Sequence, residues 1–310
     1  MSFIVFLVTV FFSCNYGFFW GLFGEENVDE RSASMRSLQD DTPNFQAQSI
    51  SLPKITGKSY SALVITDLHY GADWGSNKED DFLEWFEDRI ISCRDSSPEK
   101  IPRFIVNLGD TADGGHRSEF KDYVAFENRV KALAAEKLGD SDYKIYSILG
   151  NHDLYNNGVT EYDSLCYPYI SSYYFSIDSD SYDSFKGFSF YFLDTANGTL
   201  GEYQLKDFKD KISDDSRPKI VLSHYPIYAG AGEADALLMR LQNTMERNTL
   251  LTYFSKYNVK QVYEGHIHKR TWFDFKKFRE DVIQSFRYGE AAVFTVNESA
   301  GTVSTEIIKF

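Results

Sequence analysis

Five short apolar runs of this chain each end on a carboxylate, an amide or an imidazole. The runs cover residues 60–66, 103–108, 143–149, 219–223 and 259–264. Their length and β-branched content predict strands. Helix-like stretches lie between the runs, at residues 79–93, 118–138, 200–212 and 234–257. Because strands alternate with helices, we expect an α/β domain. The tail predicts further antiparallel strands at residues 271–275, 286–296 and 302–309.

The residues that end these runs have the chemistry of metal ligands. In open α/β sheets, ligands bind at the carboxyl ends of strands, so we expect these side chains along one edge. Imidazole and carboxylate suit zinc, iron and manganese, and one ion takes three or four such ligands. The candidate ligands are Asp67, His69, Asp110, Asn151, His224, His266 and His268. Seven ligands are too many for one ion and predict two ions that share a bridging carboxylate.

Five sequence blocks around these residues carry a resemblance to a known family. The blocks are TDLHYG (66–71), LGDTAD (108–113), LGNHD (149–153), LSHYP (222–226) and EGHIH (264–268). In this order they resemble the motif series of the calcineurin-like metallophosphoesterases. The resemblance implies an α/β fold in which two mixed sheets form a β-sandwich flanked by helices, in four αββα layers. It also implies a dinuclear metal-dependent phosphoesterase, in which a metal-bridging hydroxide attacks phosphate mono- or diesters.

The resemblance implies a role for each candidate residue. It assigns Asp67, His69 and His268 to the first metal, Asn151, His224 and His266 to the second, and Asp110 to a bridge between both. His152 is implied to contact the phosphate and to protonate the leaving group without binding metal. Asp153 is implied to hydrogen-bond His152 and to set its tautomer.

Departures from the family pattern narrow the interpretation. Asp113 stands where purple acid phosphatases place a tyrosine, so we expect no tyrosinate–iron colour. Gly114 stands where protein serine/threonine phosphatases place an arginine, and Asp153 stands where they place a glutamate. Both differences weaken the interpretation of the chain as a protein phosphatase. Two alternatives stay open, a non-catalytic binding scaffold and a pyrophosphatase or sphingomyelinase-like hydrolase on the same site. The ligand set suits iron, manganese and zinc alike.

The charge and the cysteine content limit which partners and which disulfide bonds are expected. The formal net charge of −14 argues against a stable nucleic-acid partner, which needs cationic side chains against phosphate. A small phosphorylated substrate is compatible with that charge, because bound metal cations supply local positive charge. Three cysteines are too few for a disulfide scaffold, and Cys93 and Cys166 either pair or stay as thiols. The oligomeric state is not predicted.

The N-terminus predicts export. We divide the chain into a signal or anchor (1–24), a polar linker (25–57) and a metallophosphoesterase domain (58–310). Residues 3–12 have the length of the apolar core of a signal peptide. Residues 3–23 are alternatively long enough for a membrane anchor, and FFSC resembles a relaxed lipoprotein signal with Cys14 lipidated. Each alternative places the domain outside the cytoplasm, in the periplasm or the extracellular space.

Overall fold

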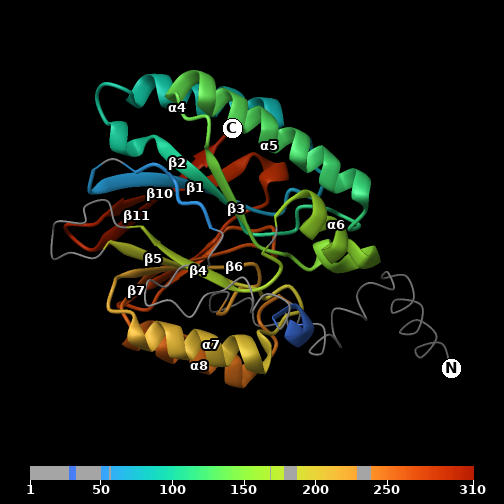
Figure 1. Cartoon of the computed structure of the whole chain (residues 1–310), viewed down its shortest axis with the longest axis vertical. Helices are drawn as coiled ribbons and strands as arrows, with labels where there is room; N and C mark the ends of the chain where they lie inside the picture. Colours follow the sequence, from blue (N-terminus) through green and yellow to red (C-terminus); the bar gives the residue numbers. More distant parts are fainter. Residues whose placement is uncertain (1–27, 33–49, 56, 168, 178–186, 229–238) are drawn as a thin grey trace.

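Two β-sheets pack face to face, and helices cover their outer faces (Figure 1). The computed structural model describes residues 28–32, 50–55, 57–167, 169–177, 187–228 and 239–310. One apolar layer lies between the two sheets, and a further layer lies between each sheet and its helices. This arrangement confirms the predicted four-layer αββα fold with two mixed sheets.

The first sheet joins three strands from the start of the domain to two from its end. Its strands are β1 (Ser59–Ile65), β2 (Pro102–Asn107), β3 (Lys144–Ser147), β10 (Glu290–Asn297) and β11 (Thr302–Lys309). They lie in the order β11-β10-β1-β2-β3. The strands β1, β2 and β3 are parallel, so their carboxyl ends meet at one edge, whereas β10 and β11 pair antiparallel.

The second sheet has six strands. They are β4 (Tyr173–Ile177), β5 (Phe188–Leu193), β6 (Lys219–Ser223), β7 (Val259–Glu264), β8 (Thr271–Asp274) and β9 (Arg279–Val282). Their order is β4-β5-β6-β7-β9-β8, with β4 and β8 antiparallel to their neighbours. The inner strands β5 and β6 are buried at every position, because the other sheet covers one face and helices cover the other. Such double burial explains why these strands read as continuous apolar runs.

The helices cover the two outer faces of the sandwich. They are α4 (Glu79–Cys93), α5 (Arg117–Leu138), α6 (Gly158–Leu165), α7 (Gly201–Asp214) and α8 (Thr244–Lys256), with short 3-10 turns η1 (Pro98–Lys100), η2 (His152–Asn157) and η3 (Phe286–Tyr288). Figure 1 shows α4 and α5 over the first sheet and α7 and α8 over the second. The α5 helix begins where the Glu119 carboxylate accepts the His116 N–H at 2.9 Å, and it ends at the left-handed Gly139.

Most predicted elements appear within two residues of their expected bounds. Helix α4 matches residue for residue, and α5 begins one residue early, with His116 at the N-cap position. Helix α8 is shorter than predicted. Residues 239–243 are not helical, and the Asn243 side chain caps the helix by accepting the N–H of Met245 at 2.9 Å. Residues 234–238 of that prediction lie outside the described residues.

Two stretches of the predicted polar linker belong to the packed domain. Residues 28–32 are helical, and the buried Arg31 forms an ion pair with Asp194 at 2.8 Å. Ile50 joins the apolar layer between the sheets, and Ser51 O accepts the Tyr146 hydroxyl at 2.8 Å. The predicted signal or anchor at residues 1–24, with Cys14, lies outside the described residues. Within the part of the chain that the structure covers, no helix has the length and apolarity that a membrane span requires.

Candidate metal centre

The loops after β1, β2, β3, β6 and β7 meet at one end of the sandwich and carry all seven predicted ligands. Backbone hydrogen bonds tie the loops together. Asp67 N donates to Gly109 O at 3.0 Å, and Gly265 N donates to His224 O at 3.0 Å. Five predicted ligands have a positive φ, which non-glycine residues rarely adopt. They are Asp67 (54°), His69 (45°), Asp110 (51°), His266 (71°) and His268 (50°). Such local strain is typical of functional sites.

The glycines of the second and third blocks are required by close backbone contact. A Cβ atom on Gly109 would collide with the backbone of Gly150, and one on Gly150 would collide with the backbone N of Asp110. Only glycine allows the two loops to approach this closely. The contact brings Asp110 next to the loop that carries Asn151.

Four side chains gather as a first ligand group. Asp67, His69, Asp110 and His268 each offer one ligand atom, and these atoms lie within 4.8 Å of one another. The Nε2 atoms of His69 and His268 are 3.0 Å apart, and His268 Nε2 is 3.3 Å from an Asp67 carboxylate oxygen. Asp110 Oδ2 lies 3.5 Å from His69 Nε2. This group contains every residue predicted for the first metal.

A second group shares Asp110 with the first. Asp110, His224 and His266 have ligand atoms within 4.8 Å of one another. His224 Nε2 lies 3.3 Å from Asp110 Oδ2 and 3.1 Å from Asn151 Oδ1. The other carboxylate oxygen of Asp110 accepts the His152 N–H at 2.8 Å. Asp110 Oδ2 therefore lies between a histidine of each group, as a bridging ligand must.

In His224 and His69, a hydrogen bond from Nδ1 to an oxygen acceptor fixes the orientation of the ring, with Nε2 toward the cluster. His224 Nδ1 donates to Leu108 O at 2.9 Å, because a carbonyl can only accept. His69 Nδ1 donates to Asp113 Oδ1 at 3.0 Å. Each ring therefore presents an Nε2 lone pair to the cluster, which is the usual arrangement of a metal-binding histidine. This donor chemistry fits two cations.

Two buried carboxylates make the cluster attractive to positive charge. Asp67 and Asp110 are buried, at 0% and 1% exposure. Burial raises the pKa of Asp110, but the nearby His224, His152 and His69 outweigh it and hold that pKa well below its usual value. Burial lowers the pKa of His224, but Asp110 outweighs this and raises it to about 9. Two buried carboxylates that hold protons on their neighbours would equally attract metal cations.

His152 is held beside the cluster by Asp113. His152 Nδ1 donates to Asp113 O at 2.6 Å and lies 3.8 Å from the Asp113 carboxylate. The same carboxylate accepts from His69, and this bond is the main cause that lowers the pKa of Asp113. His152 is only half-buried, with 30% of its side chain exposed, so it can be reached from outside.

The prediction that Asp153 hydrogen-bonds His152 is wrong. Asp153 is fully buried and turns away, and its two oxygens accept the backbone N–H of Ala112 at 2.9 Å and of Gly150 at 2.8 Å. Asp153 therefore joins the loops after β2 and β3. The tautomer of His152 is instead set by Asp113 O, and sequence reasoning missed this because it treated Asp113 only as the absence of a tyrosine.

Comparison with protein families decides the identity. The calcineurin-like phosphoesterase model matches residues 60–270, which include all the motif blocks. The chain belongs to the calcineurin-like phosphoesterase family. As a member it is a metal-dependent hydrolase of phosphoric esters, with a His and Asp cluster for a dinuclear metal site. Comparison with curated proteins by sequence finds no match.

Solved structures support the fold of this phosphoesterase. The anchor in the inner membrane complex of Plasmodium has a TM-score of 0.57 at 15% identity, over 82% of this chain and 85% of its own. A purple acid phosphatase from yellow lupin (Lupinus luteus) seeds has a TM-score of 0.50 at 13% identity, over 83% of this chain and 55% of its own. A dimetal phosphatase from Danio rerio has a TM-score of 0.49 at 14% identity, over 81% of this chain and 99% of its own. At these identities the first two likenesses show the fold alone, and the third, with a TM-score below 0.5, is too weak to show it.

Aromatic rings that sequence reasoning did not place surround the phosphoesterase cluster. Trp74 stacks on His268 with ring centroids 5.0 Å apart, and Tyr225 stacks on His266 at 3.8 Å. Tyr155 lies 4.8 Å from the His152 ring. Trp74 and Tyr155 lie outside the motif blocks, so their only sequence signal was a position near them, whereas Tyr225 stands inside LSHYP.

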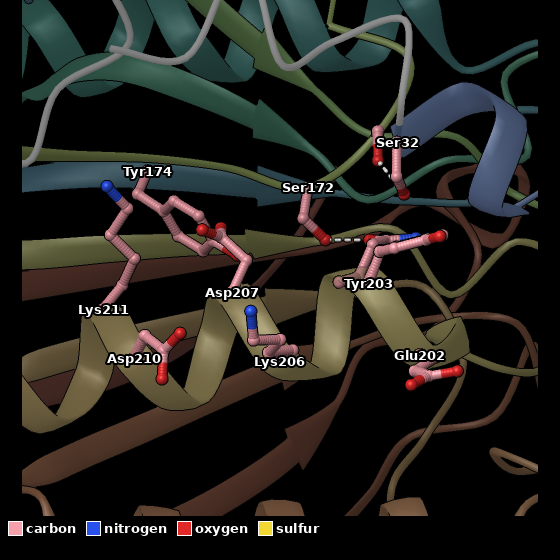
Figure 2. A pocket seen from close by; sticks show the side chains of 11 residues that line it. Ser32, Ser172, Tyr174, Glu202, Tyr203, Lys206, Asp207, Asp210 and Lys211 are labelled. Carbon is pink, nitrogen blue, oxygen red and sulfur yellow. Dashed lines mark hydrogen bonds between the residues drawn. The ribbon is translucent and has the colours of Figure 1, made fainter. Parts of the chain in front are cut away.

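The remaining histidine, the two described cysteines and a cavity lie away from the metal-ligand cluster. His116 is exposed at the start of α5, and Cys93 and Cys166 are free thiols, so they do not pair. A separate cavity of about 780 Å³ lies between α7 and β4, and Figure 2 shows Ser172, Tyr174, Lys206 and Asp207 around it. It shares no residue with the metal-ligand groups.

Proposed function

We propose that this phosphoesterase hydrolyses phosphate mono- or diesters of small molecules, with His152 as the acid that protonates the leaving oxygen. The observation that carries the proposal is the complete set of seven ligand side chains, with a non-ligand histidine held beside it. Bound cations would neutralise the phosphoryl charge and lower the pKa of an attacking water. In the proposal, Asp67, His69 and His268 hold the first cation, Asn151, His224 and His266 hold the second, and Asp110 holds both.

The tautomer of His152 supports its proposed role. Because Nδ1 donates to Asp113 O, the nitrogen that can face a substrate is Nε2. With Nδ1 protonated, Nε2 carries a proton only when the ring is cationic. A cationic imidazole can hydrogen-bond a phosphoryl oxygen and then give its proton to the departing alkoxide.

A non-catalytic scaffold is the second candidate. It is favoured by the likeness to a Plasmodium protein that is described as an anchor. A scaffold has no need for a full ligand set or for a partly exposed histidine beside it, and this chain has both. A pyrophosphatase or a sphingomyelinase-like hydrolase would use the same side chains and would differ in its substrate.

The test combines metal analysis with a substrate panel on the full chain. Purified protein is loaded with Mn²⁺, Zn²⁺ or iron, and its hydrolysis of aryl monoesters, diesters and pyrophosphate is compared. We expect His152→Ala to keep both ions and to lose turnover by about 10²–10⁴-fold, and Asn151→Ala to weaken the second ion. His116→Ala is the matched control, because this histidine is exposed and outside the cluster. Absence of bound metal and of hydrolysis in the wild type would refute the proposal.

The N-terminus supports a separate proposal on location. We propose that residues 1–24 export the domain and that Cys14 carries a lipid, on the basis of the apolar run at residues 3–12 and the FFSC sequence. Mass spectrometry of the mature protein from a bacterial host tests this proposal. A mature chain that begins at Met1 and carries no lipid would contradict it.

A further inference from the structure

The loop that carries His69 is held by a segment outside the motif blocks. This segment is the η3 turn and its neighbour Ser285, which follow β9 and lie beyond the family match at residues 60–270. Ser285 Oγ donates to Asp67 O at 2.7 Å, and Phe286 N donates to Thr66 O at 2.9 Å. The first motif block is therefore fixed from a part of the chain more than 200 residues away.

Arg287 continues this attachment along the loop. Its Nε donates to Trp74 O at 2.7 Å, its Nη1 to His69 O at 3.2 Å and its Nη2 to Ala72 O at 3.3 Å. One planar guanidinium thus joins both ends of the loop at residues 69–74, which a single-point donor could not do. A Cβ atom on Gly75 would lie 3.0 Å from Arg287 Cβ, so the chain turns tightly around this side chain.

Trp74 transmits the attachment to the metal ligands. The Arg287 guanidinium lies 5.2 Å from the centroid of the Trp74 ring. That ring stacks on His268 at 5.0 Å with an interplanar angle of 30°, and meets His69 edge-on at 4.9 Å. His69 and His268 come from different sheets and are both predicted to bind the first metal. Trp74 is therefore in contact with two imidazoles whose relative placement determines the first site.

The Arg287 guanidinium is mainly engaged by the protein itself. Three of its five N–H donors, one on each nitrogen, are directed at backbone carbonyls of the loop at residues 69–74. These contacts give Arg287 a role in holding that loop.

We propose that Arg287 is a positioning residue of the first metal site, which holds Trp74 against His69 and His268. The inference rests on the metal roles proposed above for these two histidines. Metal ligands need their supporting contacts to stay within a few tenths of an ångström, and loss of such contacts costs about 10–100-fold in metal affinity. Loss of the Arg287 contacts should therefore weaken the first site more than the second, because the ring contacts of Trp74 with metal-ligand histidines in the described structure are with His69 and His268.

The experiment measures the two metal affinities separately in the full chain. Metal-free protein is dialysed against a series of Mn²⁺ concentrations, and bound metal is counted by elemental analysis. Arg287→Ala should weaken one of the two sites by about tenfold or more, and Trp74→Leu should weaken the same site. The metal affinity of Arg287→Lys should lie between those of the wild type and Arg287→Ala, because one ammonium cannot reach all three carbonyls. Arg279→Ala is the matched control, because Arg279 also lies over a tryptophan, Trp272, at 4.4 Å, but pairs with Asp281 away from the cluster.

The outcomes separate this inference from the proposed function. Two ions in the wild type and unchanged affinities in Arg287→Ala would overturn the positioning role and leave the proposed function intact. Equal weakening of both sites would also overturn it, because that result indicates general destabilisation. Fewer than two ions in the wild type would refute both. If Arg287→Ala does not fold, the variants Arg287→Lys and Trp74→Leu test the inference instead. Wild-type Mn²⁺ affinity in both variants would overturn it.

Discussion

The ion pair between Arg31 and Asp194 should contribute more to stability than any surface pair of the molecule. Arg31 Nη2 lies 2.8 Å from Asp194 Oδ2, and the two side chains are only 7% and 2% exposed. Arg31 also donates to Asn197 Oδ1 at 2.6 Å and to Ile170 O at 3.1 Å. Removal of one partner leaves the other charge buried without a counter-charge, which costs about 3–5 kcal/mol. We expect this loss in the unfolding free energy of Asp194→Ala, and a similar loss in Arg31→Ala.

Urea unfolding of both single variants and of the double variant tests this expectation. Because the two residues interact, the double variant should lose less than the sum of the single losses. Arg117→Ala is the control, since its partner Glu161 and Arg117 itself are 28% and 52% exposed, and such pairs contribute about 1 kcal/mol or less. Additive losses, or a loss in Asp194→Ala no larger than the control, would refute the reasoning.

Three further predictions concern pH, metal and a glycine. Burial is the main cause, and the neighbouring Glu280 the next, that raises the pKa of Glu264 well above its ordinary value of 4.5. As the pH rises above 4.5, the unfolded chain releases this proton while the folded chain keeps it. The stability of the fold therefore falls with rising pH until Glu264 also ionises in the folded chain. Glu264→Gln should flatten this fall in thermal-unfolding midpoints; an unchanged slope would contradict it. Saturation of one site at about 100 times its Kd should add about 2.7 kcal/mol to the unfolding free energy, and a chelator should remove it. Gly150→Ala should cost about 1–3 kcal/mol in urea unfolding, because its Cβ would collide with Asp110 N. Gly139→Asn should cost less, because a Cβ there meets nothing within 4 Å and asparagine tolerates the left-handed φ of 68°.

The sequence predicted β1, β2, β6 and β7 because these strands are buried on both faces. Such runs stand out from their surroundings, and their polar ends fall where the parallel strands stop. Strand β9, which lies between β7 and the edge strand β8, was missed for the opposite reason. Strand β9 reads Arg-Glu-Asp-Val, yet Glu280 and Asp281 are buried at 2% and 4% exposure, because neighbouring side chains and amides satisfy them. No local pattern indicates a strand that buries two carboxylates.

The candidate ligands were predictable because each is tied to a motif block, but their supporting contacts were not. Asp153 belongs to a block, and its neighbour in sequence suggested the wrong partner. Its oxygens instead satisfy amides of two different loops. Arg287 acts on backbone carbonyls, which every residue has, so its partners leave no trace in the sequence. Prediction from motifs therefore identifies the chemistry and misses what holds it in place.

The centre lies across the boundary between the two sheets, and this explains why the support is built from backbone contacts. Asp67, Asp110 and Asn151 follow strands of the first sheet, whereas His224 and His266 follow strands of the second. Each ligand group therefore draws on both sheets, and a shift of one sheet would separate the ligands of both groups. Contacts that cross the boundary oppose such a shift, such as the bond from His224 Nδ1 to Leu108 O. The same sandwich packing that stabilises the fold thus determines the distances between the ligand atoms.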